Sequence, residues 1–152
     1  MNGPLCKHHC AHHFIWKNLI FSPGESIMEG TLDAVLLLGH GSRVAAANLP
    51  LGEVAAMLSV AMGGVKVKPA FLQLAEPSLG AALEELYEGG ARKVAIMPFF
   101  LFPGAHVLED IPEELEKARQ KHPDFELVMS SHIGAHPKLA EIALERIKES
   151  VS

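Results

Sequence analysis

From residue 31 onward, the hydrophobic and polar positions of the chain change pattern in a regular order. Residues 32–38, LDAVLLL, form a continuous apolar run, which is typical of a strand buried on both faces of a sheet. Residues 44–62 follow and are rich in Ala, Leu, Val and Met at helical spacing. Pro50 lies inside this segment, so it predicts either the real start of the helix or a break in it.

The same alternation of strand and helix patterns occurs three more times. Expected strands cover residues 65–74, 93–102 and 125–131, and expected helices cover residues 77–87, 110–121 and 137–150. Asp110, followed three residues later by Glu113, has the pattern of an N-cap with a capping box. Pro137 suits the first turn of the last helix, because proline is tolerated there.

Four alternating strands and helices predict an α/β fold. We expect a four-stranded parallel sheet with helices on both faces. In sheets of this kind, ligands bind beyond the carboxyl ends of the strands. Residues that directly follow the strands are therefore the first place to look for chemistry.

The first 27 residues do not share this pattern. They contain the ligand-rich stretch CKHHCAHH, in which thiolates and imidazoles suit Zn²⁺ or a similar metal, although their spacing is irregular. Residues 24–28 can be encoded by a purine-rich ribosome-binding sequence just ahead of the codon for Met28. We expect Met28 to be the natural initiator, residues 1–27 to be a disordered or non-native extension, and residues 28–152 to be the α/β domain; a metal-binding tail is the alternative.

Composition narrows the classes of partner. The net charge is −5, which argues against nucleic acid because its partners carry clustered Lys and Arg. The longest apolar run, residues 95–108, is interrupted by Pro98 and Pro103 and is too short to span a membrane. Cys6 and Cys10 are the only cysteines, so the body of the protein has no disulfide framework, as expected for the cytoplasm.

Polar, aromatic and metal-ligating residues are concentrated after the expected strands. The candidates are His40, Ser42, Arg43, Gln73, Glu76, Phe99, Phe100, Phe102, Gly104 and His106. Two histidines at neighbouring strand ends suggest metal binding or proton transfer. Taken singly, each of them is as readily explained as an ordinary core or loop histidine. The phenylalanines form either the wall of a pocket for a flat apolar ligand or plain core packing.

Four segments at these positions resemble one known family. They are GHGS (39–42), FLQLAEPSL (71–79), GAHVLEDIP (104–112) and IGAHPKLAEI (133–142). Together they resemble the sirohydrochlorin chelatases, specifically the short single-domain class II type that includes the sirohydrochlorin cobaltochelatases of anaerobic cobalamin synthesis. The resemblance spans residues 32–147 and leaves residues 1–27 outside.

The resemblance implies a lyase that inserts a divalent metal into sirohydrochlorin, a tetrapyrrole, while two pyrrole protons are lost. His40 and His106 match the metal-binding and proton-accepting histidines, and Glu76 is a further candidate metal ligand. Co²⁺ is the expected metal substrate, with Fe²⁺ or Ni²⁺ as alternatives, and no tightly bound cofactor is expected. The expected contacts to the macrocycle are Ser42, Arg43, Phe99, Phe100, Phe102 and Gly104.

The short relatives also imply a homodimer in which each chain is one chelatase-like half-unit. One departure from the family is Gln73, where relatives often carry glutamate, so a carboxylate role at that position is in doubt, and Glu76 and Glu109 are the two candidates to replace it. A non-catalytic metal carrier that uses CKHHCAHH is the alternative from another functional class. A phosphohistidine enzyme fits less well, because Arg43 is the only arginine that is well placed near a strand end.

Overall fold

The computed structural model describes residues 31–102 and 104–151, with the backbone alone at residues 105–108. The predictions for residues 1–27, including a metal site in CKHHCAHH, lie outside this range. The strands are β1 (Ala34–Gly39), β2 (Lys66–Phe71), β3 (Lys93–Pro98) and β4 (Glu126–Met129). The helices are the 3₁₀ helix η1 (Ala45–Asn48), α1 (Leu49–Ala61), α2 (Leu79–Glu88), α3 (Ala105–Lys121) and α4 (Pro137–Ser150).

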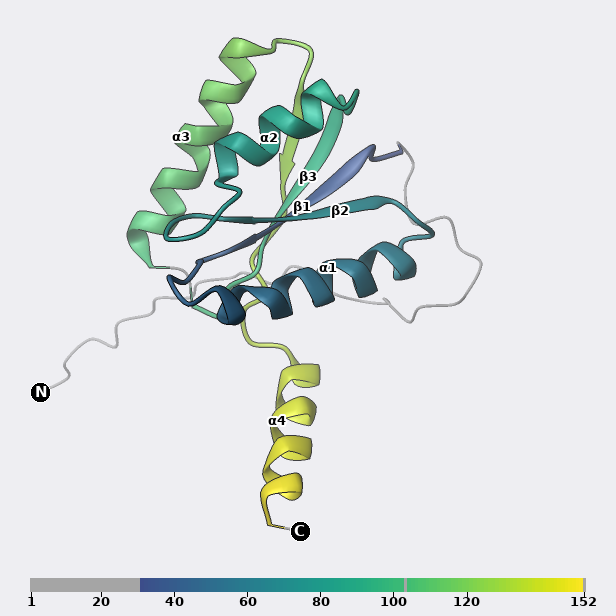
Figure 1. The fold of residues 1–152 in the computed structure, drawn as a ribbon, viewed down its shortest axis with the longest axis vertical. Helices are drawn as coiled ribbons and strands as arrows, with labels where there is room; N and C mark the ends of the chain where they lie inside the picture. The colour runs from purple at the N-terminus through teal and green to yellow at the C-terminus, as the bar shows by residue number, and fades with distance from the viewer. Residues whose placement is uncertain (1–30, 103, 152) are drawn as a thin grey trace, which may run out of the picture.

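All neighbouring strands pair in parallel, in the order β2-β1-β3-β4 (Figure 1). The predicted four-stranded parallel sheet is confirmed. Gly39 is paired with Phe71, and Leu38 is paired with Pro98, so β1, β2 and β3 end at the same level. The loops that follow these three strands therefore emerge side by side at one edge of the sheet.

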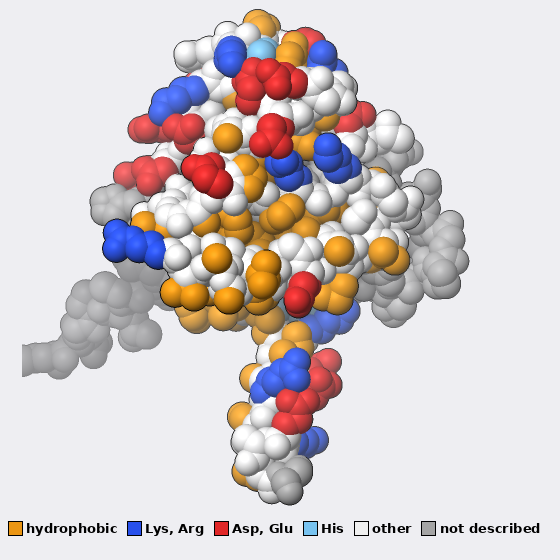
Figure 2. All heavy atoms as spheres, in the orientation of Figure 1, with side chains coloured by type: hydrophobic (Ala, Val, Ile, Leu, Met, Phe, Trp, Pro, Cys, Tyr) orange, Lys and Arg blue, Asp and Glu red, His pale blue; other side chains and the backbone are white. Residues whose placement is uncertain are grey.

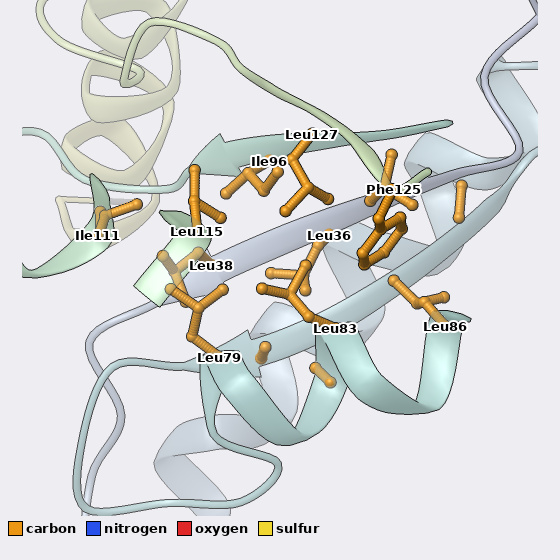
Figure 3. Packing of buried hydrophobic residues seen from close by; sticks show 14 of the residues in the cluster. Leu36, Leu38, Leu79, Leu83, Leu86, Ile96, Ile111, Leu115, Phe125 and Leu127 are labelled. Carbon is orange, nitrogen blue, oxygen red and sulfur yellow. The ribbon is translucent and has the colours of Figure 1, made fainter. Parts of the chain in front are cut away.

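Side chains of β1 alternate between two cores, one on each face of the sheet. Leu36 and Leu38 belong to the larger core, which lies between the sheet and the helices α2 and α3 (Figure 3). Leu37 points to the opposite face, where Leu51 and Ala55 of α1 cover it. Helices thus cover both faces, as the continuous apolar run of β1 predicted.

The first helical segment begins as Pro50 predicted, because α1 starts at Leu49 after the short η1 and has the proline in its first turn. The predicted start of α3 was wrong. The helix begins at Ala105 with Gly104 as its N-cap, so Asp110 lies inside it. Asp110 and Glu113 have the spacing of a capping box, but the helix is already formed before them and passes through Pro112 with one backbone hydrogen bond fewer.

The last helix, α4, begins at Pro137 as predicted and extends away from the sheet (Figure 1). Its N-cap His136 accepts a hydrogen bond at Nδ1 from the backbone N–H of Lys138, at 3.2 Å. No helix within residues 31–102 and 104–151 combines the length and apolar character that crossing a bilayer requires.

Candidate active site

A cavity of about 680 Å³ lies at the carboxyl edge of the sheet, where the sequence predicted a site. Its volume is within the range of about 300–1,000 Å³ that is typical of small-molecule sites. The loops after β1 and β2, the start of α2 and the N-terminal part of α3 form its walls. The lining residues are His40, Leu72, Gln73, Ser78, Leu79, Gly80, Gly104, Asp110, Glu113 and Glu114.

His40 directly follows β1 and is an exposed member of this lining. Its ring lies against the buried ring of Phe100, with centroids 4.8 Å apart and planes inclined at 57°. Its backbone carbonyl accepts a hydrogen bond from the N–H of Gln73, at 3.1 Å. No residue of the described segments hydrogen-bonds to the ring nitrogens, so the imidazole is held in place while its nitrogens remain available to a ligand.

The two glycines beside His40 make room for the protein's own packing. A Cβ atom on Gly39 would lie 2.8 Å from a side-chain carbon of Leu51. Gly41 has a φ of +89°, and a Cβ atom there would lie 1.9 Å from the backbone carbonyl oxygen of Gln73. Helix α1 therefore approaches Gly39, and the loop after β2 approaches Gly41.

The opposite wall of the cavity is acidic. Asp110, Glu113 and Glu114 of α3 line it, and no Lys or Arg in the described part of the chain does so. Glu114 accepts a hydrogen bond from Nζ of Lys117 at 2.6 Å, and this contact raises the pKa of Lys117. Neither Asp110 nor Glu113 forms an ion pair with another described residue, so their carboxylates remain available to a cation.

The three candidate phenylalanines lie in three different surroundings. Phe100 is buried in the larger core and supports His40. Phe99 packs on the α1 side of the sheet, and Phe102 is 84% exposed. The structure therefore does not bring the three rings together into one wall.

The other candidates are also spread around the cavity. Gly104 lines it, whereas Ser42, Arg43 and Glu76 do not. The backbone N–H of Ser42 donates to Oδ1 of Asn48 at 2.9 Å, which stabilises the loop that leads into η1. The Glu76 carboxylate accepts a hydrogen bond from the N–H of Ser78 at 2.7 Å, just before α2.

His106 is the second residue of α3, two positions after Gly104. Its side chain lies outside the described atoms, so its convergence with His40 stays a prediction. Within the described residues, no group of three or more His, Cys, Asp or Glu side chains is arranged to hold a metal ion. The described site thus offers one imidazole and a carboxylate wall, a donor set that suits transient binding of a metal better than permanent storage.

The acidic wall is the part of the site that the sequence analysis missed. Asp110 and Glu113 were interpreted as a cap and its partner, and that interpretation depended on the wrong start of α3. Once α3 is extended back to Ala105, these residues fall on the cavity side of the helix. Helical spacing counted from Gly104 as the N-cap is the signal that would have found them.

The sequence is similar to those of known sirohydrochlorin chelatases. A sirohydrochlorin ferrochelatase from Arabidopsis thaliana is 34% identical over 135 residues, which cover 87% of this chain and 60% of that protein. A sirohydrochlorin cobaltochelatase from Methanopyrus kandleri is 30% identical, with 78% of this chain and 96% of the relative covered. The chain thus spans less than two thirds of the Arabidopsis relative but nearly all of the archaeal one.

A solved chelatase structure has the same fold. The sirohydrochlorin chelatase SirB from Bacillus subtilis subspecies spizizenii, solved in complex with cobalt, superposes with a TM-score of 0.70 at 28% identity. The match covers 78% of this chain and 51% of SirB. The CbiX family model matches residues 34–150, which include the whole sheet and the cavity. The chain belongs to the CbiX family.

Proposed function

We propose that this chain inserts a divalent metal ion, Co²⁺ above all, into sirohydrochlorin. The observation that carries the proposal is His40, an exposed imidazole with available nitrogens in a cavity at the carboxyl edge of the sheet. Both relatives described above are sirohydrochlorin chelatases, which supports sirohydrochlorin as the substrate. The archaeal cobaltochelatase, matched over 96% of its length, favours cobalt, and the Arabidopsis ferrochelatase makes Fe²⁺ the second candidate.

The chemistry requires that a metal be delivered and that two pyrrole protons be accepted. A neutral imidazole binds first-row divalent ions reversibly and accepts a proton near neutral pH, so His40 suits either step. The carboxylates of Asp110 and Glu113 attract a divalent ion to the opposite wall of the same cavity. His106, one turn or less from Gly104, is proposed as the second proton acceptor or ligand.

The polarity of the cavity indicates how the tetrapyrrole enters. The acidic wall repels the carboxylates on the rim of the macrocycle, so we propose that this wall faces the metal. Leu72 and Leu79 offer apolar contact to the flat body of the ring. We propose that Arg43, which is exposed on the loop after β1, meets the rim carboxylates outside the cavity.

The decisive experiment is anaerobic incubation of the purified protein with sirohydrochlorin and Co²⁺, following the absorption change on metal insertion. His40→Ala is expected to lower the rate at least about 100-fold, because it removes an acid–base and ligand group. His132→Ala is the matched control, since His132 is exposed and lies outside the cavity lining. Insertion by His40→Ala at the parental rate would refute the proposal.

We also propose that the active species is a cytoplasmic homodimer. A chain that matches 51% of SirB supplies one α/β unit where the longer protein has room for two. In this arrangement each cavity opens toward the second copy, whose residues would complete the surroundings of the macrocycle.

A further inference from the structure

Leu74, in the loop after β2, has a backbone conformation that is unusual for a leucine. Its φ is +64°, which lies in the left-handed region. In the described part of the chain, every other residue with a positive φ is a glycine. The left-handed region is unfavourable for a leucine because its Cβ atom approaches the following carbonyl oxygen. Backbone strain of this kind persists only where the surrounding structure enforces it, and it is concentrated at functional sites.

The neighbours of Leu74 on both sides enforce this conformation. Before it, the backbone N–H of Gln73 donates a hydrogen bond to the carbonyl of His40 at 3.1 Å, which ties the loop to the end of β1. After it, Ala75 packs against the core between the sheet and α1. The chain therefore has to turn at Leu74 to satisfy both contacts.

The turn explains the backbone of Leu74 but not its side chain. A glycine adopts the left-handed region without a steric penalty, and an asparagine tolerates it better than a leucine does. The Leu74 side chain is 52% exposed and belongs to neither of the two cores. The strained backbone and the exposed apolar surface both lower the stability of the chain alone, so the leucine side chain needs a contact outside the chain to account for it.

The position of Leu74 indicates where that contact lies. Its neighbour Gln73 lines the cavity, whereas Leu74 itself does not, so Leu74 lies at the rim. On the loop after β3, Leu101 and Phe102 are also exposed, and Gly104 beyond them lines the same cavity. Figure 2 shows hydrophobic side chains gathered on the lower part of the body, near the carboxyl end of β1 in Figure 1. Two loops thus present apolar side chains next to residues of the cavity lining.

The chemistry of a tetrapyrrole suits such a rim. The carboxylates at the edge of the macrocycle are repelled by Asp110 and Glu113, so they project out of the cavity and the flat ring passes its mouth. An exposed leucine gains free energy in proportion to the apolar area that the ring covers. Because the backbone of Leu74 is fixed in advance, little additional ordering is needed when the contact forms.

We propose that Leu74 contacts the flat body of sirohydrochlorin at the mouth of the cavity and determines how tightly the macrocycle is held. The inference rests on the proposed function and adds a substrate-binding residue to it. It has two consequences of opposite sign. Replacing the leucine weakens binding of the substrate, and the same replacement relieves the strain in the free protein.

Leu74→Asn tests both consequences. Asparagine adopts the left-handed conformation more readily than leucine and lacks the apolar side chain. The Kd for metal-free sirohydrochlorin, followed by the absorption or fluorescence of the tetrapyrrole, is expected to rise about fivefold, because roughly half of the leucine surface remains to be covered. In turnover, KM for sirohydrochlorin should rise while kcat stays within about twofold. The urea midpoint is expected to equal or exceed that of the parental protein.

Two further variants serve as controls. Leu74→Met keeps an apolar side chain on the same backbone and is expected to bind sirohydrochlorin within about twofold of the parental Kd. Val60→Asn removes an apolar side chain of α1 that is 81% exposed and outside the cavity lining. Valine and asparagine have similar helix propensities, so this variant is expected to leave both the Kd and the urea midpoint unchanged.

Each contrary result has a separate meaning. If Leu74→Asn binds sirohydrochlorin as tightly as the parental protein, the inference is refuted while the proposed function stands. A lower urea midpoint for Leu74→Asn would show that the leucine stabilises the fold instead, and a lower solution mass by light scattering would assign it to a contact between copies; either result refutes the inference. If the parental protein itself does not bind sirohydrochlorin, the proposed function is refuted and the inference with it.

Discussion

Single residues at the site are constrained by the protein's own backbone. Gly41 lets the loop after β1 lie against the loop after β2. In the same contact, the backbone carbonyl of His40 accepts a hydrogen bond from the N–H of Gln73. A side chain at position 41 meets two obstacles, a φ of +89° and the carbonyl oxygen of Gln73 at 1.9 Å from the new Cβ atom. The position of the catalytic candidate therefore depends on a residue that has no side chain.

Gly41→Ala is expected to destabilise the fold by about 3 kcal/mol or more, since the strained φ alone costs on the order of 1–3 kcal/mol. It should also lower metal insertion by displacing the Gln73 loop. Gly64→Ala is the control: its φ is +93°, but nothing lies within 4 Å of the added Cβ atom. Urea denaturation of both variants measures the difference, and equal losses of stability would show that the contact with Gln73 is unimportant.

Asp33 has a comparable role at the opposite end of the sheet. Its Oδ2 accepts hydrogen bonds from the backbone N–H groups of Arg92 and Lys93, at 2.7 and 2.8 Å. These bonds lower the pKa of Asp33 below its ordinary value of 3.8. The ionised carboxylate thus joins the starts of β1 and β3.

A lowered pKa in the folded state means that Asp33 stabilises the fold above its unfolded pKa and that this contribution disappears as the pH falls through the folded pKa. Asp33→Asn keeps an oxygen acceptor but loses the charge. Its thermal midpoint should lie below the parental one at pH 7, and the difference should shrink as the pH falls below about 4. A difference that stays constant from pH 7 to pH 3 would contradict this account.

At the scale of elements, much of the fold was predictable from the sequence. A continuous apolar run predicted β1, and Pro50 and Pro137 predicted where two helices begin. The start of α3 was not predictable in the same way, because Asp110 and Glu113 have the pattern of a capping box inside the helix. The acidic wall was missed with it, because Asp110 and Glu113 were interpreted as a cap and its partner, whereas both line the cavity.

The ends of α2 and α3 are joined by stacked rings. Tyr87 of α2 stacks on His122, which follows α3, with centroids 3.7 Å apart, and the Arg92 guanidinium lies 3.9 Å from the centroid of the Tyr87 ring. The Tyr87 hydroxyl donates to Asp124 at 2.8 Å, a bond that raises the pKa of Tyr87 and lowers that of Asp124.

Tyr87→Ala is therefore expected to lower the thermal midpoint by several degrees, because it removes the ring contacts with His122, Phe125 and Arg92 at once. Tyr87→Phe keeps the rings and loses only the exposed hydrogen bond, so its effect should be clearly smaller. Metal insertion should be unchanged in Tyr87→Phe, since Tyr87 is outside the cavity lining. If the two variants are equally destabilised, the hydroxyl rather than the stacking holds the helices together.

At the scale of the whole molecule, the question is whether residues 1–27 contribute to function. The cavity is lined by residues from His40 to Glu114, and the family match begins at residue 34. A carrier would depend on the Cys and His residues of CKHHCAHH, whereas the proposed chelatase does not.

Deletion of residues 1–27, with Met28 as initiator, is expected to leave the rate of metal insertion within about twofold of the parental rate. Equilibrium dialysis with Co²⁺ provides the second measurement, since a carrier would lose most of its bound metal on deletion. Peptide mapping of the protein from its natural host tests the start site, and peptides from residues 1–27 would contradict initiation at Met28.

The level ends of β1, β2 and β3 have a consequence for how such a protein diversifies. The polar groups that line the cavity come from loops and from helix residues outside the buried cores. Leu36, Leu38 and Ile96 stabilise the sheet and do not line the cavity. Substitutions that alter the lining of the cavity can therefore accumulate on one edge of the sheet while the buried cores remain unchanged. Selection on the ligand of the cavity and selection on stability then act on different residues.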